Sequence, residues 1–187
     1  MSECRIFRSG NDSHFMTKRF DRADGKKIHM QSLGAITHVS YQEPALCSYE
    51  LAARYMKEIG LVPREIEQFY RRMAFNCLAA NQDDHVKNVS FLMDRTGRWT
   101  LAPAYDITFA YDKDNKWLRG HQMTVNGKTT DIGAADILAA GKAMGLKERR
   151  CKVIAEECAE VIGRFPDFAK EAGIRKETVD YINSVIS

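Results

Sequence analysis

Residues 81–92 read Asn-Gln-Asp-Asp-His-Val-Lys-Asn-Val-Ser-Phe-Leu, and a second polar stretch, Pro-Ala-Tyr-Asp-Ile, follows at residues 103–107. Acids, amides, one imidazole and one ammonium group gather here, between the end of a predicted helix and the far end of a predicted hairpin. Magnesium is usually held by one or two carboxylates together with the oxygens of a bound phosphate. The two stretches therefore suit a site for a metal-bound polyphosphate.

The spacing within these stretches resembles that of a phosphoryl-transfer site. Asp83 and Asn88 are five residues apart, and Asp106 follows one hairpin later. Protein kinases use a catalytic-loop Asp that receives the hydroxyl proton, an Asn five residues on and a later Asp for the metal. An Asp-Asp-His run after a helix, taken alone, is more often a solvated turn. The offsets to Asn88 and Asp106 favour the catalytic interpretation, with Asp83 as base.

Four neighbouring residues each have a functional and a structural interpretation. His85 either lines the nucleotide site or orients the loop by bonding a backbone carbonyl. Lys87 is either a phosphate contact or a surface lysine beside a hairpin. Tyr105 and Phe20 are expected to pack as walls of a site rather than to react, because aromatic rings usually act in that way beside an adenine or a metal loop.

The helices that precede residues 81–92 are predicted from apolar periodicity. Residues 44–59 place Pro44 in a first turn and Gly60 at the stop, and residues 63–80 carry one apolar stripe. The second helix would deliver the polar stretch from a buried scaffold. Residues 89–93 and 99–102 then predict two strands joined by a turn, so that the two polar turns lie at the same end of one ribbon.

The remaining segments predict an α+β, mainly α-helical chain with no linker between domains. Residues 5–8 and 14–20 are β-prone runs joined by turn-forming residues 9–13, and residues 28–31 suit a short strand. Residues 112–133 are polar and predict a long loop with a hairpin turn at Asn126-Gly127. Four further helices are predicted at residues 134–144, 147–162, 166–172 and 175–186.

Composition sets broad limits on function. A chain of 187 residues with 44% hydrophobic residues can bury a core, and 28 basic against 25 acidic residues do not by themselves indicate a nucleic-acid partner. Five cysteines without a C-x-x-C pair suggest neither a disulfide framework nor a zinc ribbon. No leader peptide and no long apolar run is seen in the sequence, so we expect a cytoplasmic protein with no membrane partner.

Three stretches, HFMTKRFDR at residues 14–22, NQDDHVKNVSFL at residues 81–92 and LAPAYDI at residues 101–107, resemble the HipA family of bacterial serine/threonine kinases. These kinases are the toxins of HipBA-type toxin-antitoxin systems. The resemblance covers nearly the whole chain as the carboxyl-terminal part of that fold. It implies a protein-kinase-like C-lobe with a short amino-terminal hairpin and a catalytic-loop hairpin.

The resemblance also implies roles for particular residues. Asp83 would be the catalytic base, Asn88 and Asp106 would bind Mg²⁺, and His85 and Asn88 would line the nucleotide and metal site. Asp84 occupies a position that need not be acidic and is given no catalytic role. The segment that would form the hinge over the nucleotide comprises Lys18, Arg19, Phe20 and Asp21.

The chain departs from the family pattern at its amino-terminal side. The twelve glycines never occur as G-x-G, and no strand before residue 18 carries a lysine for the α- and β-phosphates. Family members place both features in an amino-terminal lobe. The resemblance implies ATP and Mg²⁺ as cofactors. Because the chain lacks both features, we expect full activity only when such a lobe is supplied. The partners implied are a protein substrate such as an aminoacyl-tRNA synthetase, a HipB-like antitoxin and through it DNA, and a separate amino-terminal lobe.

Two other classes of function remain open from the sequence. The chain could be a catalytically silent module that docks an antitoxin or the missing lobe. A metal-dependent hydrolase that uses Asp83, Asp84, His85 and Asp106 is a weaker alternative, because a dinuclear centre normally needs more His and carboxylate ligands.

Overall fold

Helix α3 (Pro63–Leu78) is the central helix of the structure, a computed structural model that describes residues 1–10 and 12–186. Pro63 occupies the first turn, where its missing N–H costs nothing, and the Glu65 side chain accepts from the N–H of Val62 at 3.0 Å. The predicted apolar stripe is buried at Ile66, Phe69, Tyr70 and Met73. The helix predicted at residues 63–80 is thus confirmed, and it ends two residues earlier.

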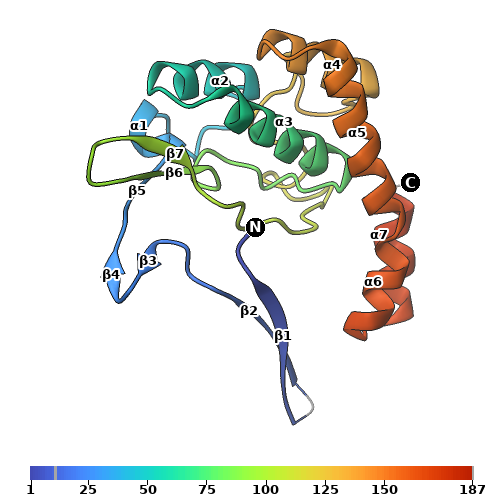
Figure 1. Ribbon diagram of the computed structural model, residues 1–187. Helices are drawn as coiled ribbons and strands as arrows, with labels where there is room; N and C mark the ends of the chain where they lie inside the picture. The colour runs from blue at the N-terminus through green and yellow to red at the C-terminus, as the bar shows by residue number, and fades with distance from the viewer. Residues whose placement is uncertain (11, 187) are drawn as a thin grey trace.

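Helices α2 (Tyr49–Glu58), α4 (Ala134–Ala143) and α5 (Glu148–Gly163) pack around α3, as Figure 1 shows at the top and right of the molecule. Helices α6 (Phe165–Ala172) and α7 (Lys176–Ile186) continue from α5. The four helices predicted after residue 133 are therefore confirmed to within one residue at each end. Within residues 1–10 and 12–186, no helix combines the length and apolarity that a membrane span requires.

The prediction that a helix begins at Pro44 is wrong. Helix α2 begins at Tyr49, and the side chain of its cap, Ser48, accepts from the N–H of Leu51 at 2.9 Å. The preceding residues pair instead with a distant segment: Ala45 donates to the carbonyl of Gln122, and Tyr49 to that of Thr124. Pro44 thus lies in a connection whose conformation is fixed by tertiary contacts that periodicity does not reveal.

The small sheet runs in the order β5 (His29–Ser32), β6 (Ser90–Met93) and β7 (Trp99–Leu101), all antiparallel. The predicted hairpin and the predicted strand near residues 28–31 are both confirmed. Helix α1 (Leu33–Thr37) follows β5 directly and was not predicted, because five residues are too few for a periodic signal. The first two N–H groups of α1, from Leu33 and Gly34, donate to the carbonyls of Val89 and Val86.

The amino-terminal hairpin consists of β1 (Cys4–Ser9) and β2 (Asp12–Thr17), and it extends away from the helical body (Figure 1). Its predicted position is confirmed, although β2 ends at Thr17 rather than at residue 20, and Asn11 of the predicted turn lies outside the described residues. Its large apolar side chains Ile6, Phe7 and Phe15 are 47–69% exposed. A two-residue ladder of β3 (Arg22–Ala23) with β4 (Lys26–Lys27) connects the hairpin to β5.

The long connection of residues 112–133 is irregular, as predicted, and contains the expected tight turn. Val125 and Lys128 exchange two backbone hydrogen bonds across Asn126 and Gly127, both of which have positive φ. Positive φ at both central positions defines the type I′ turn that Asn-Gly favours.

Replacement of Gly141 by Ala tests the packing of α4 against α3 and α5. An added Cβ would lie 2.5 Å from Cys151 Sγ and 2.7 Å from Tyr70 Cε2. We expect a loss of about 1–3 kcal/mol in the free energy of unfolding, as for other overpacked cores. Urea unfolding followed by circular dichroism measures it. The control is Gly163→Ala in α5, where nothing lies within 4 Å, and there we expect unchanged or slightly higher stability. Equal stability of both variants would contradict this packing.

Candidate functional site

The loop of residues 81–89 leaves the end of α3 and is held from two sides. Ala80 turns the chain with a φ of +51°, and the N–H of Asn81 donates to the carbonyl of Asn76 at 2.9 Å. On the other side, the two N–H groups of α1 described above bond the carbonyls of Val86 and Val89. These two side chains are buried, so the loop has a fixed apolar side and a polar side.

The 81–89 loop lies directly against residues 105–110, as the predicted ribbon requires. Gln82 donates to the carbonyl of Ala110 at 3.0 Å, and Ala110 donates to that of Ala80 at 3.1 Å. The Tyr105 hydroxyl donates to the carbonyl of Lys87. The Asn81 side chain reaches the carbonyl of Asp106 at 3.5 Å. The two polar turns, far apart in sequence, thus share one region of the structure.

Asp83, His85 and Asn88 are arranged within this loop. The Asn88 Nδ2 group donates to the carbonyl of Asp83 at 2.9 Å, so the Asn88 Oδ1 atom is the one suited to ligate a cation. His85 Nε2 lies 3.9 Å from Asp83 Oδ1, which is beyond hydrogen-bond range. His85 Nδ1 is buried without a partner among the described residues, so the predicted bond from this ring to a backbone carbonyl is not seen there.

The carboxyl group of Asp83 is electrostatically perturbed. Its side chain is 45% exposed. Partial burial raises its pKa, the nearby His85 lowers it, and the negative charges of Asp106 and Asp84 raise it further, with a net upward shift. A carboxylate with a raised pKa is a stronger base and lies nearer to the range that general-base catalysis requires.

The strand that leads to Asp106 is attached to α3. Arg72 donates from Nη2 to the carbonyl of Ala102 at 2.6 Å, and Glu65 Oε1 accepts from the N–H of Leu101 at 2.8 Å. Burial lowers the pKa of Arg72 to about 10. Asp106 itself is exposed and has a φ of +54°, a conformation that Asp tolerates better than most residues. The strand that leads to Asp106 and the loop that carries Asp83 are therefore both attached to one helix.

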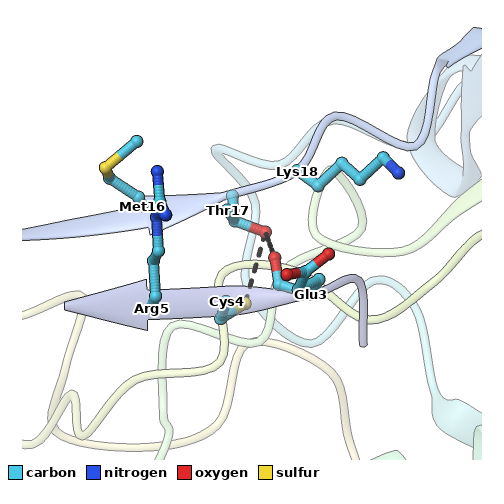
Figure 2. A pocket seen from close by; sticks show the side chains of 6 residues that line it. All are labelled: Glu3, Cys4, Arg5, Met16, Thr17 and Lys18. Atoms are coloured by element: carbon cyan, nitrogen blue, oxygen red, sulfur yellow. Dashed lines mark hydrogen bonds between the residues drawn. The ribbon is translucent and has the colours of Figure 1, made fainter. Parts of the chain in front are cut away.

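The predicted hinge residues reach the site to different extents. Phe20 packs on Tyr105 with ring centroids 5.6 Å apart, so this ring pair forms a wall beside the loop. Asp21 accepts from Arg19 and Arg22, and the hydrogen bond from Arg19 contributes most to lowering its pKa to about 2. Lys18 lies at the base of the hairpin, in a hollow shared with Glu3, Cys4 and Thr17 (Figure 2). The structure thus joins Phe20 to the 81–89 loop and places Lys18 beside the hairpin.

Lys87 points across the loop toward an aromatic side chain. Its Nζ atom lies 3.7 Å from the centre of the Tyr41 ring, a cation–π contact. The same ring meets His85 edge to face at 5.6 Å. Tyr41 was not singled out from the sequence, since a lone tyrosine in a polar connection carries no motif.

Asp84 has a structural role that was not predicted from the sequence. Its side chain is 1% exposed and accepts three hydrogen bonds: from the Tyr49 hydroxyl at 2.7 Å, from His121 Nδ1 at 2.8 Å and from the N–H of Gln122 at 2.7 Å. A carboxylate can only accept, so His121 carries its proton on Nδ1. Burial raises the pKa of Tyr49, and the charge of Asp84 adds to this shift, which keeps the phenol protonated as a donor.

The network of Asp84 extends to the Asp106 turn. Asn76 Nδ2 donates to the Tyr49 hydroxyl at 2.9 Å, and Asn81 Nδ2 donates to Asn76 Oδ1 at 3.0 Å. As described above, Asn81 also reaches the carbonyl of Asp106. One buried chain of polar groups therefore connects α2, α3, the loop and the second turn. No sequence motif identifies these partners.

The acids of the region do not form a closed metal centre. In the part of the chain that the structure describes, no group of three or more His, Cys, Asp and Glu side chains could hold an ion. Asp84 is occupied by its three donors, which weakens the hydrolase alternative. Asp83, Asn88 and Asp106 fit the other pattern, in which Mg²⁺ takes one or two carboxylates and shares the rest of its shell with phosphates and water.

Comparisons with known proteins identify the family and the fold of the chain. The family model for the HipA-like C-terminal domain matches residues 1–164. A solved structure described as the Shewanella oneidensis MR-1 toxin-antitoxin system HipA, HipB and its operator DNA complex matches with a TM-score of 0.73 at 17% identity. The match covers 98% of this chain and 48% of that one, so this chain spans about half the length of the structure it matches. The comparison with curated proteins gives no significant match.

Asp106→Asn tests whether Asp106 acts on Asp83 through space. Removal of the Asp106 charge should lower the pKa of Asp83, and His85→Gln should raise it, because His85 lowers that pKa in the native chain. The pKa is read from the ¹³C shift of the Asp83 carboxyl group in metal-free buffer. An Asp83 pKa that does not respond to either change would show that these groups are not neighbours.

Asp84→Asn tests the buried network. The new amide would point a donor at one or more of the three donors that now face the carboxylate, so we expect a loss of roughly 1–3 kcal/mol in the free energy of unfolding. Urea unfolding measures the loss. The matched control is Asp114→Asn at an exposed position, which should leave stability nearly unchanged. Equal stability of the two variants would contradict a stabilising role for the Asp84 network.

Proposed function

The chain belongs to the family of HipA-like C-terminal domains, and from this premise we propose that it is the C-lobe of a serine/threonine protein kinase of the toxin-antitoxin type. In this proposal the γ-phosphoryl group of ATP passes to a hydroxyl of a protein substrate. The observation that carries the proposal is the joining of the 81–89 loop to residues 105–110. This joining, through backbone groups that include the Asp83 and Asp106 carbonyls, supports a common site for Asp83, Asn88 and Asp106, whose sequence offsets are kinase-like.

Asp83 receives the proton of the attacking serine or threonine hydroxyl in this proposal. Its raised pKa and partial exposure support that role, since a base must be both reachable and sufficiently basic. Asn88 and Asp106 would hold Mg²⁺, which when bound neutralises negative charge on the phosphates. Asn88 also holds the carbonyl of Asp83, so it orients the base whether or not a cation is present.

The ring pair of Phe20 and Tyr105 is proposed as the wall against which adenine packs, together with the backbone of residues 18–21. His85 would line the nucleotide side of Asp83. Lys87 would contact phosphate after leaving the ring of Tyr41, because its amine now lies over that ring. Asp21, held by two arginines, would fix the turn that carries Phe20 rather than contact the nucleotide.

The charge clamp on the α- and β-phosphates is proposed to come from an amino-terminal lobe, either from a longer form of this chain or from a separate polypeptide. Phosphoryl transfer depends mainly on positioning and electrostatic stabilisation, so the residues described here should give very weak transfer alone. By analogy with the HipA–HipB–DNA assembly named above, we propose a HipB-like antitoxin as partner, and through it DNA. An aminoacyl-tRNA synthetase is the protein substrate suggested by family resemblance.

A second candidate function is a catalytically silent module that docks an antitoxin or an amino-terminal lobe. The observation in its favour is the hairpin β1–β2, whose apolar side chains Ile6, Phe7 and Phe15 are exposed. Titration calorimetry with Mg-ATP, on the chain alone and after addition of a candidate amino-terminal lobe, separates the two functions. Nucleotide binding in either case favours the kinase, and none in both favours the silent module.

Asp83→Asn and Asp106→Asn test the kinase proposal in a form that includes the amino-terminal lobe. Loss of the base should lower transfer from [γ-³²P]ATP by roughly 10²–10⁴-fold. Loss of Asp106 should also raise the concentration of Mg²⁺ that half-maximal transfer requires. The control is Asp167→Asn, an exposed acid of α6 that should transfer phosphate like the native chain. Transfer that persists in Asp83→Asn would remove the assigned base.

A further inference from the structure

A groove of about 460 Å³ opens beside Asp83 and His85. Two segments complete its lining: Tyr41 and Gln42 form one wall, and the second wall consists of Asn115, Trp117, Leu118 and Gln122. We infer that this groove receives the substrate segment that carries the acceptor hydroxyl. That segment is an extended stretch with an uncharged aliphatic or aromatic residue beside its serine or threonine. The inference rests on the proposed kinase function and specifies its substrate class.

The position of the groove relative to the base supports this assignment. Asp83 and His85 line the groove, whereas the residues proposed for the cation and for adenine (Asn88, Asp106, Phe20 and Tyr105) lie outside its lining, so the groove adjoins the proposed nucleotide site at His85. In phosphoryl transfer the attacking oxygen and the leaving oxygen are roughly in line across the phosphorus. A hydroxyl that enters through the groove meets Asp83 from a direction separate from the nucleotide wall, as that geometry requires.

The lining determines the chemistry of the occupant. Asp83 is its single carboxylate, and apart from His85 the other lining side chains are aromatic, aliphatic or amide groups. Tyr41 is 41% exposed and Trp117 is 37% exposed, so both rings have uncovered surface. Exposed aromatic rings are enriched where proteins bind other proteins. An acidic residue beside the acceptor would be repelled by Asp83, and the exposed rings favour an aliphatic or aromatic neighbour.

Basic side chains at the rim are already engaged with the rings. Lys87 lies over Tyr41 at 3.7 Å, and Lys116 lies 4.5 Å from the centre of the Trp117 ring. Each ammonium group lies against an aromatic face, and neither lysine is among the residues that line the groove. The lining therefore favours a substrate segment that contacts the aromatic rings over one that carries an acidic motif.

Residues of both walls are attached to the 81–89 loop. Gln122 donates through Nε2 to the carbonyl of Trp117 at 2.5 Å, and its N–H donates to Asp84 Oδ1 at 2.7 Å. On the other wall, the Tyr41 ring contacts His85 edge to face. The distance from either wall to Asp83 is thus set before a substrate arrives, and such preorganisation positions a reacting group.

Binding of synthetic peptides to the chain tests the inference without requiring catalysis. The probe is a positional-scanning library of peptides with a fixed central serine, measured by fluorescence polarisation. We expect the best peptides to carry aliphatic or aromatic residues beside the serine. Trp117→Ala and Tyr41→Ala should each weaken binding of the best peptide about tenfold, as for truncation of an aromatic anchor.

The matched control is Phe168→Ala, an aromatic side chain of α6 that is 42% exposed and should not affect peptide binding. If an alanine variant unfolds, Gln42→Trp, at an exposed position, should block the groove by bulk and weaken binding equally. Affinity for Mg-ATP is measured in parallel and should be unchanged by Trp117→Ala.

The groove assignment is overturned if the folded groove variants bind peptide like the native chain, or if the native chain binds no peptide of the library. Failure of the kinase proposal is a separate result: no binding of Mg-ATP with or without an amino-terminal lobe, whatever the peptides do.

Discussion

The buried carboxylate of Asp84 is the constraint on which the site depends. A charged group at 1% exposure is tolerated only when donors surround it, and here the three donors come from α2 and from residues 121–122. Because Asp84 follows Asp83 directly, a displacement of the 81–89 loop at these residues would break these bonds. The bonds that hold the buried Asp84 side chain therefore also fix the backbone position of Asp83.

Two adjacent acids thus have opposite environments and different tasks. Asp84 is enclosed and fully bonded, whereas the Asp83 side chain is 45% exposed and has a raised pKa. The Asp84 side chain is buried in the core, whereas the Asp83 side chain lines the groove. Environment, rather than residue type, gives Asp84 a structural role and suits Asp83 to proton transfer.

Part of this arrangement could be predicted from the sequence. The apolar stripe of residues 63–80 identified α3, the Asn126-Gly127 pair identified its turn, and the β-prone runs at residues 89–93 and 99–102 identified their hairpin, because these signals are local. The short helix α1, the start of α2 at Tyr49 and the partners of Asp84 could not be predicted. Each depends on contacts between segments far apart in sequence, such as Gln122 with Ala45 and with Asp84. The role of Asp84 was missed because an acid in a polar motif does not reveal which way its side chain points.

The central claim is that the loop of Asp83 and Asn88 and the turn of Asp106 share one divalent cation. Paramagnetic broadening of amide resonances by Mn²⁺, added with ATP to a form that includes the amino-terminal lobe, tests this claim most directly. The account predicts that the strongest broadening occurs together at residues 83, 88 and 106 and falls off toward α6 and α7. Broadening centred elsewhere, or confined to one of the two segments, would contradict it.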